Sequence, residues 1–315
     1  MGAPRRVAVA ASAGLDSTAL LHCTLRAAAP LGIKVLALHV HHGLMPQADT
    51  WLGQVRDQAR RWGATFDSRR LEGRPGPGDS LEAWARTGRY AALAEMAAQA
   101  GCDIVLLAHH RRDQAETWLL QALRGAGPAG LSAMPAQARR AGMVWARPWL
   151  TLPREAIEAY VRRHRLRHAD DPSNADPGLA RSRLRQAIWP ALTGAFPHAE
   201  ATIAAAASLA QQATQLADEV AAHDLPAVTD GDTLRIEAWR QLPPARRRNA
   251  LRSWLARVCG VLPPETLLRR LEQELPGPGA RHWHAPGGQL SQHRGRLSFV
   301  RLLRGAATGQ PQAGR

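Results

Sequence analysis

Apolar runs and amphipathic stretches alternate along the first half of the chain. Short apolar runs bounded by polar or small residues are typical of buried strands, and the stretches between them are typical of helices. The expected strands are Val7–Ala11, Lys34–Val40, Ala64–Ser68, Asp103–Ala108 and Met143–Arg147. The expected helices are Ser17–Ala28, Asp49–Trp62, Ser80–Ala100 and Gln114–Leu123, and Asp79 with Glu82 forms a capping box at the start of the third.

This alternation predicts the fold class. Parallel strands need crossover helices, and right-handed crossovers place those helices on both faces of one sheet. We therefore expect an α/β domain with a doubly wound, five-stranded parallel sheet. In such folds the ligand crevice lies at the carboxyl ends of the strands, where the loops after Ala11, Val40 and Ala108 meet.

The pattern changes in the second half. An alanine- and glutamine-rich run over 197–223 predicts one long connecting helix. After Pro226, two strands and two helices predict a small α+β module; they are Thr233–Ile236, Arg246–Val258, Thr266–Glu274 and Leu297–Leu302. We therefore expect one domain over 1–192, a helical connector over 193–225, a second domain over 226–305 and a disordered tail over 306–315.

Charge narrows the choice of partners. The 315-residue chain holds 41 Lys and Arg against 26 Asp and Glu, a net charge of +15, and its only lysine is Lys34. Arginine binds phosphate through two parallel hydrogen bonds, so the excess favours a polyanionic partner, with nucleic acid preferred over a membrane. An arginine-rich codon bias is the alternative explanation for this excess.

Cysteine usage excludes several classes of site. Cys23, Cys102 and Cys259 lie far apart, so no Cys-x-x-Cys pair is present to hold zinc, an iron–sulfur cluster or a redox disulfide. We interpret them as small buried residues in a reducing compartment. No apolar stretch approaches membrane-spanning length, which predicts a cytoplasmic protein with no membrane contact.

The stretch from Val7 to Thr18 predicts a strand, a tight loop and a helix start in succession. Backbone N–H groups and the positive end of a helix would then surround one point, which suits a phosphate-sized anion. Asp16 is unusual there, because a carboxylate beside a phosphate is repulsive unless it holds a cation such as Mg²⁺. The spacing matches neither GxxxxGK[ST] nor GxGxxG, and an ordinary strand-to-helix turn stays open as the alternative.

Other polar clusters follow the second and fourth strands. The histidines in 39–42 could line a nucleotide crevice, bind a metal or belong to a solvated loop. Asp113 and Glu116 lie three apart at a helix start, where they could hold Mg²⁺ or the ammonium of an amino acid. Complementing the helix dipole would explain them equally well. Arg181 and Arg185 lie one helical turn apart and could together grip a phosphate.

Several motifs occur in an order that resembles a known family. The Ser12–Ser17 loop is similar to the SGGxDS loop of the ATP pyrophosphatases. HVHHGL, AHHxxDQAET, RGAGPAGL, RPWL and DDPSN followed by RSxLR come after it. Together they resemble the tRNA(Ile)-lysidine synthases over residues 5–192, and more weakly over Leu242–Leu303. The resemblance implies an adenine nucleotide alpha-hydrolase-like fold.

The resemblance also implies a reaction. Enzymes of that family use ATP to adenylate the C2 carbonyl oxygen of the wobble cytidine in a tRNA-Ile with a CAU anticodon. A lysine amine then displaces AMP. ATP would bind to Ser12, Ala13, Gly14, Leu15, Asp16 and Ser17, with His41 and His109 as further contacts. Asp16 would hold Mg²⁺, Asp113 and Glu116 would hold L-lysine, and Arg181 and Arg185 would neutralise phosphate or tRNA backbone. A homodimer is compatible with the resemblance.

Three positions depart from the family pattern: Ala13 replaces a Gly, Arg112 replaces an Asp, and Ser182 replaces an Asn. Alanine tolerates a positive φ poorly, so Ala13 has either a negative φ or a strained backbone. Arg112 removes one acid, and because Asp113 and Glu116 are kept we interpret that change as tuning. In the second half, Trp239, Trp254 and Trp283 could stack on bases or belong to the core.

Two alternative functions remain at this stage. A tRNA thiolase of the same fold would need catalytic cysteines, which are missing from the loop positions. A nucleotide- or RNA-binding protein without catalysis would not need Asp16, Asp113 and Glu116. The hypothesis that the protein is a ligase is therefore preferred over these two alternatives.

Overall fold

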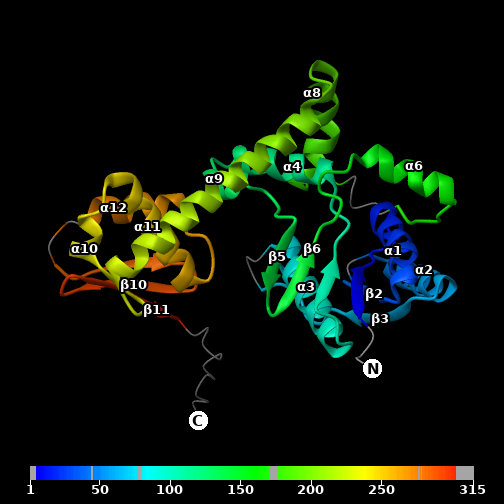
Figure 1. Cartoon of the computed structure of the whole chain (residues 1–315), viewed down its shortest axis with the longest axis horizontal. Helices are drawn as coiled ribbons and strands as arrows, with labels where there is room; N and C mark the ends of the chain where they lie inside the picture. The colour runs from blue at the N-terminus through cyan, green and yellow to red at the C-terminus, as the bar shows by residue number, and fades with distance from the viewer. Residues whose placement is uncertain are drawn as a thin grey trace, which may run out of the picture. The chain divides into compact units, whose positions relative to one another are not determined.

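The computed structural model describes residues 5–43, 45–76, 80–170, 176, 178–275, 277 and 279–302. The chain separates into two compact units, one formed by 1–125 with 130–209 and the other by 126–129 with 210–315. The boundary falls within α9 (Ala199–Val228), the long helix of Figure 1. This helix continues two residues past Pro226, where a change of character was expected, because a proline interrupts only its own turn. No helix in the described ranges is long and apolar enough to span a membrane.

A six-stranded sheet forms the centre of the first unit, in the order β3-β2-β1-β4-β6-β5. Its strands are β1 (Arg6–Ala10), β2 (Lys34–His41), β3 (Thr65–Arg70), β4 (Ile104–Leu106), β5 (Gln137–Arg140) and β6 (Met143–Ala146). The five predicted strands are all present and pair in parallel. The expected count of five is wrong, because β5 adds an antiparallel edge strand whose polar residues give no apolar run.

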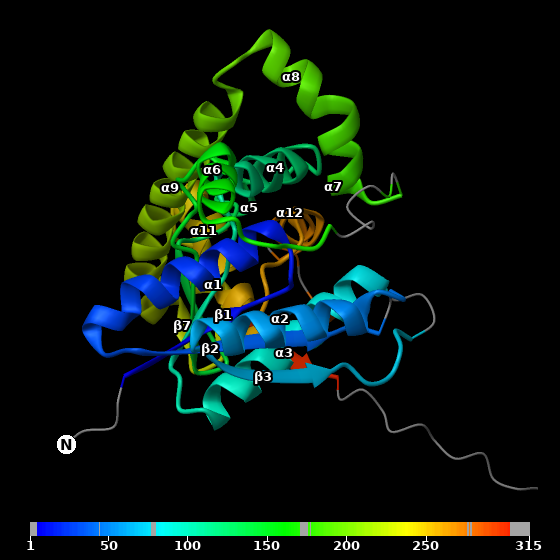
Figure 2. The same cartoon turned by 90° about the vertical axis from the view of Figure 1, so that its right-hand side faces the viewer.

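Helices cover both faces of this sheet, which confirms the doubly wound fold. Residues on one face, such as Val9 and Val35, pack on α1 (Leu15–Ala28) and α2 (Ala48–Trp62). Figure 2 looks toward this face. Residues on the other, such as Ala8 and Leu36, pack on α3 (Leu81–Gln99). Alternate strand residues therefore serve opposite cores.

The remaining helices of this unit include α4 (Arg111–Ala122) and α6 (Arg154–His164), and the 3₁₀ turn η1 (Ala29–Leu31) follows α1. The division between the units falls within the short helix α5 (Pro128–Leu131). Ser80 caps α3 by accepting a hydrogen bond from the Ala83 amide, and the expected capping residue Asp79 lies outside the described residues.

A π-helical turn, η3 (Leu184–Ile188), separates α7 (Ala180–Arg183) from α8 (Trp189–Ala195). Pro190 lies just after it and has no N–H to donate to the carbonyl four residues earlier. The ordinary helical ladder therefore cannot continue unchanged through this stretch. Such turns are rare and often lie at functional sites. This one carries Arg185.

Arg112 has a structural role in this unit. Its Nε donates to Glu200 Oε2 at 3.0 Å and its Nη2 donates to Glu155 Oε1 at 2.8 Å, while Arg111 Nε donates to Glu200 Oε1 at 2.9 Å. Glu200 is buried at the start of α9 and Glu155 lies on α6. Arg112 therefore fastens α4 to both helices, which explains why arginine can replace an acid at this position.

Replacing Arg112 with aspartate is expected to destabilise the first unit by about 2–3 kcal/mol, because it breaks a partly buried ion pair and sets two carboxylates against each other. Chemical denaturation at neutral pH measures the loss. Arg112→Gln, which removes the charge without adding repulsion, serves as the control and should cost less. Equal losses would show that the acid next to Glu200 is tolerated.

The second unit is an antiparallel sheet with helices packed on it, as the expected α+β module requires. Its sheet order is β7-β8-β11-β10-β9. Its elements are β7 (Thr229–Asp230), β8 (Thr233–Arg235), α10 (Ile236–Arg240), α11 (Pro244–Cys259), α12 (Glu265–Glu274), β9 (Arg281–Ala285), β10 (Gly288–His293) and β11 (Arg296–Arg301). The sequence pattern missed β7, β9, β10 and α10, which are short or rich in polar residues.

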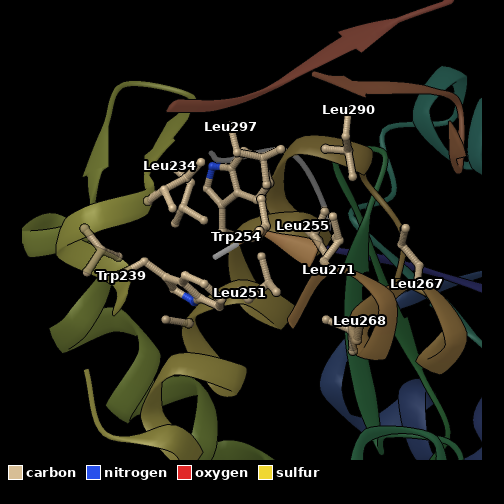
Figure 3. Packing of buried hydrophobic residues seen from close by; sticks show 14 of the residues in the cluster. Leu234, Trp239, Leu251, Trp254, Leu255, Leu267, Leu268, Leu271, Leu290 and Leu297 are labelled. Atoms are coloured by element: carbon tan, nitrogen blue, oxygen red, sulfur yellow. The ribbon is translucent and has the colours of Figure 1, made fainter. Parts of the chain in front are cut away.

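Three tryptophans belong to the core of this second unit (Figure 3 labels two of them). Trp239 and Trp254 have no exposed surface, and Trp283 is 2% exposed. Each indole N–H donates to a protein oxygen: the Arg247 carbonyl, the Asp232 carbonyl and the Glu274 carboxylate, respectively. Base stacking by these rings is therefore wrong, because a buried indole offers no face to RNA.

Candidate active site

The loop after β1 is held by its own small polar side chains. Ser17 Oγ accepts a hydrogen bond from the Ser12 amide at 3.0 Å and donates to the Gly14 carbonyl at 3.1 Å. The hydroxyls of Ser12 and Ser17 lie 3.0 Å apart. Thr18 Oγ1 donates to the Ala13 carbonyl. The loop is therefore pre-shaped, and Ser12 is exposed just after the carboxyl end of β1.

Ala13 adopts a left-handed backbone with φ of 71°. The strained-loop alternative is therefore the one observed, since alanine disfavours this region relative to glycine. Its side chain is buried, and its carbonyl accepts hydrogen bonds from Thr18 and from the Ala169 amide at 2.9 Å. These contacts keep Ala13 in a conformation that the family pattern normally gives to glycine.

Helix α1 begins at this loop, with Gly14 as the residue before its first turn. The first helical hydrogen bond is donated by the Thr18 amide to the Gly14 carbonyl. The amides of Leu15 and Asp16 precede that bond, and such first-turn N–H groups carry the positive end of a helix dipole. The loop and the helix start thus lie together as expected, and the binding of an anion there stays a prediction.

Asp16 fits a bound cation. Its Oδ1 is buried and has no hydrogen-bond partner among the described residues, and its Oδ2 lies 3.7 Å from His110 Nε2. A buried carboxylate oxygen without a donor is costly unless a cation neutralises it. Within the described ranges no group of three or more His, Cys, Asp and Glu side chains forms a protein-only metal site. Mg²⁺ is commonly held by one or two protein carboxylates together with phosphates, and Asp16 would suit such an ion.

His110 joins the loop to the next helix. It is buried at the start of α4, and its Nε2 lies 3.4 Å from Asp113 Oδ2 as well as 3.7 Å from Asp16 Oδ2. Its backbone amide donates to Asp113 Oδ2 at 3.1 Å, which caps the helix. The geometry thus supports the interpretation that Asp113 complements the helix dipole. Asp113 also contacts His110 Nε2 and Arg185, so it has more than this one role.

His109 is kept uncharged by its surroundings. Burial lowers the pKa of His109 to about 3; the Asp113 carboxylate opposes this shift, while Arg147 and Arg181 add to it. Its Nδ1 is buried and lacks a hydrogen-bond partner in the described part of the chain. A neutral imidazole in this place can accept or donate one hydrogen bond to a ligand without adding charge.

Acid is expected to destabilise the protein through His109. The unfolded chain binds a proton at this histidine near pH 6.5, whereas the folded chain binds it only near pH 3. Lowering the pH from 6.5 toward 3 therefore favours the unfolded state, by up to about 1.4 kcal/mol per pH unit. Urea midpoints at pH 7 and pH 4.5 should fall further for the native protein than for His109→Gln. Parallel pH profiles would contradict the prediction.

Two carboxylates and two arginines, Asp113, Glu116, Arg181 and Arg185, form what we call the acid–arginine cluster. Glu116 Oε1 accepts from Arg185 Nε at 2.7 Å and its Oε2 accepts from Arg185 Nη2 at 2.9 Å. Arg181 Nε lies 3.1 Å from the same carboxylate. Arg185 Nη2 also donates to Asp113 Oδ1 at 3.1 Å. The predicted acid pair and the predicted phosphate-binding arginines thus contact one another.

Burial distinguishes the two acids. Glu116 has no exposed surface, whereas the side chain of Asp113 is 12% exposed. Burial by itself would raise the pKa of Asp113, but electrostatic interactions with His110, His109 and Arg181 and the hydrogen bond from the His110 amide outweigh it and hold that pKa below its usual range. Asp113 is therefore an ionised carboxylate at the crevice, and the better placed of the two to meet an ammonium group.

His41 is occupied by the protein itself. Its Nδ1 accepts from the Gly43 amide at 3.1 Å, so its Nε2 carries the proton and faces Asp49 Oδ1 at 3.2 Å. Arg70 Nη2 lies 3.2 Å from the same nitrogen. His41 joins the end of β2 to α2 and β3, and its predicted contact with a nucleotide stays a prediction.

The structure thus brings Asp16, His109, Asp113, Glu116, Arg181 and Arg185 to one side of the sheet's carboxyl edge through His110. His110 was not among the predicted site residues, although it stands in the AHHxxDQAET motif. Thr117 was not among them either, and its Oγ1 accepts from Arg181 Nη2 at 2.8 Å. Ser182 is buried in α7. Leu44 and residues 171–174 of the DDPSN segment lie outside the described residues.

Comparisons with known proteins agree with this architecture. Residues 2–192 match the family model of the PP-loop domain, and residues 234–298 match that of the TilS substrate binding domain. The U34-tRNA thiolase NcsA from Methanococcus maripaludis superposes with a TM-score of 0.57 at 15% identity. That match covers 66% of this chain and 72% of the thiolase, and it shows a shared fold.

Curated relatives extend the match to nearly the whole chain. A tRNA(Ile)-lysidine synthase of Ralstonia nicotianae is 42% identical over 98% of this chain, and one of Bordetella bronchiseptica is 41% identical over 96%. The chain spans 66% of the Ralstonia relative and 89% of the Bordetella relative. A PP-loop domain implies the use of ATP. On this identity and coverage, the chain belongs to the tRNA(Ile)-lysidine synthase family.

Proposed function

We propose that this protein is an ATP-dependent ligase that joins L-lysine to C2 of the wobble cytidine in a tRNA-Ile with a CAU anticodon. The observation that carries the proposal is the junction at His110, which lies 3.7 Å from Asp16 and 3.4 Å from Asp113. An anion cradle and a carboxylate that can receive an amine therefore share one crevice, as a reaction between a nucleotide and an amine requires. The names of the curated relatives support the same reaction.

Two steps account for the product. In the first, the C2 carbonyl oxygen of the cytidine attacks the α-phosphorus of ATP, and pyrophosphate leaves with the electron pair of the broken bond. In the second, one of the two amino groups of lysine attacks C2 in its neutral form, AMP leaves with the oxygen, and the attacking nitrogen releases a proton to water. The other amino group stays an ammonium. Adenylation is needed because a carbonyl oxygen is otherwise a poor leaving group.

The side chains of the crevice suit these steps. The amides of Leu15 and Asp16 would stabilise negative charge on the phosphates. Mg²⁺ fits the unpartnered Oδ1 of Asp16, and when bound there it would neutralise phosphate charge. Arg181 and Arg185 are 35% and 29% exposed, so donors that Glu116 leaves unused could reach a phosphate or the RNA backbone.

Replacing Asp113 with alanine is expected to raise the lysine concentration needed for half-maximal rate far more than the ATP concentration. The ionised carboxylate of Asp113 would hold the lysine ammonium, whereas the loop holds ATP. Steady-state kinetics with each substrate varied in turn measures the two effects. Equal effects would mean that Asp113 serves ATP or its cation.

The overall reaction is tested by incubating the protein with ATP, radiolabelled lysine and bulk tRNA. Acid-stable lysine on tRNA only in the presence of ATP, with AMP released in equal amount, supports the ligase. ATP binding without AMP release would favour a non-catalytic binding protein. Release of AMP without lysine on the RNA would point to a different nucleophile, as in a thiolase.

A further inference from the structure

A second cavity in the first unit lies away from the crevice. It has a volume of about 400 Å³ and is lined by residues of α1, α2 and the end of α6. Its inner wall carries the rings of His22, Trp62 and His164. The His22 ring centroid lies 5.0 Å from that of Trp62 and 5.1 Å from that of His164, and all three residues are partly exposed. The ring planes of His22 and Trp62 meet at 71° and those of His22 and His164 at 48°, so the cavity has a ring-bearing wall whose rings are tilted against one another.

Three arginines surround this cavity: Arg61, Arg165 and Arg167, all of them exposed. Among the residues that the structure describes, none of their guanidinium groups has a carboxylate within 4 Å. Some other arginines of this unit are paired, for instance Arg69 with Glu95 and Arg70 with Asp49. The acid of the cavity, Asp57, lies 3.7 Å from Arg56 Nε. The opening is thus lined by three arginines and one carboxylate, which leaves it with a net positive charge.

Arg165 is held there against its backbone preference. It ends α6 in the left-handed conformation, with φ of 50° and ψ of 43°, where glycine is usual. Gly63, which ends the neighbouring α2, shows the usual solution. A non-glycine residue in this region costs on the order of 1 kcal/mol. Arg165 therefore lowers the stability of the fold slightly at a position where its charge lies beside the cavity.

We propose that this cavity binds a backbone phosphate of the tRNA substrate, with the adjoining nucleotide against the ring-bearing wall. Arginine suits phosphodiester oxygens through paired hydrogen bonds, and aromatic rings suit an unstacked base or its ribose. The proposal rests on the proposed function, because it takes RNA as the substrate. It assigns an RNA contact to the first unit, apart from the matched substrate binding domain over 234–298.

The segment that leaves the cavity also reaches the ATP-binding loop. Gln58 Nε2 donates to the Arg167 carbonyl, and two residues later the Ala169 amide donates to the Ala13 carbonyl at 2.9 Å. An RNA phosphate bound at Arg167 would therefore restrain the segment 167–169, which supports the strained residue Ala13. The cavity is still expected to affect mainly the binding of tRNA, because none of its three arginines belongs to the candidate active site.

The test compares two triple variants in binding assays with labelled tRNA at several salt concentrations. Arg61→Gln, Arg165→Gln and Arg167→Gln together should weaken binding roughly tenfold and make the salt dependence shallower by about one unit per lost phosphate contact. The control carries Arg5→Gln, Arg124→Gln and Arg139→Gln, three exposed arginines of the same unit. It removes the same charge and should change binding far less. Matching affinities and salt slopes in the two variants would overturn the proposal.

Two further measurements separate the remaining outcomes. Arg165→Gly should weaken tRNA binding yet raise the melting temperature, because it removes charge and relieves the left-handed backbone. If both tRNA affinity and melting temperature fall, Arg165 is a merely structural residue.

A measurement with inorganic phosphate tests for a small anion. If phosphate shifts the melting temperature of the native protein but not of the triple variant, and tRNA binding is the same in both, the cavity binds a small anion and the RNA contact is rejected. Lysine transfer at saturating tRNA should persist in the triple variant, so failure of the native protein to form lysidine would count against the proposed reaction alone.

Discussion

Replacing Asp16 with asparagine is expected to abolish the release of AMP and pyrophosphate while the protein stays folded. The two side chains have almost the same shape, so the loop and α1 should be kept. The charge is what changes: the buried Oδ1 without a hydrogen-bond partner among the described residues would no longer attract a cation. Without that cation the phosphates of ATP meet an uncompensated crevice, and a rate loss on the order of a hundredfold or more follows.

The measurement is pyrophosphate release with tRNA and lysine present, beside circular dichroism and thermal melting to establish folding. Asp103→Asn provides a matched control, because it removes the same charge at an exposed position just before β4. Turnover of Asp16→Asn at the rate of this control would remove Asp16 from the mechanism. Restoration of the rate by a large excess of Mg²⁺ would confirm that the defect is one of cation affinity.

Replacing Glu116 with glutamine is expected to destabilise the first unit by about 3–5 kcal/mol, since it leaves two guanidinium groups beside a neutral, buried amide. Glu116 has no exposed surface and contacts both Arg181 and Arg185. The loss is large because buried charges depend on their partners far more than exposed ones do. Urea denaturation at neutral pH measures it.

Glu155→Gln is the matched control, because Glu155 also pairs with an arginine but is 63% exposed. It should cost less than about 1 kcal/mol. Similar losses in the two variants would show that the acid–arginine cluster adds little to stability. If the Glu116→Gln protein stays folded and only the lysine concentration needed for half-maximal rate rises, Glu116 contacts the lysine directly, as the family resemblance implies.

The sequence predicted the elements wherever one physical signal dominated. Strands such as Lys34–His41 are continuous apolar runs buried on both faces, and no other element fits that pattern. β5 was missed because Gln137 and Arg140 lie on an edge, where burial imposes no pattern. Helix α4 begins at Arg111, three residues earlier than expected, because the cap formed by Asp113 on the His110 amide is a local contact that periodicity does not report.

The site was predicted in part for the same reason. The loop around Asp16 and the cluster residues carry motifs, so their identity and shared edge of the sheet follow from topology. Their mutual contacts could not be predicted. Arg181 and Glu116 are 65 positions apart, and no local rule indicates that a buried carboxylate rather than a phosphate faces that guanidinium. The roles of tryptophans such as Trp254 depended on burial in the same way.

The π-helical turn limits how the gene can change in length. A turn of this kind holds one residue more than an ordinary helical turn, and each helical residue rotates the chain by about 100°. Deleting a single codon between Leu184 and Ile188 would remove that additional residue and rotate either Arg185 or Trp189 to another side of the helix. Relatives that differ in length should therefore place their insertions elsewhere, in exposed stretches such as the one around Gly73.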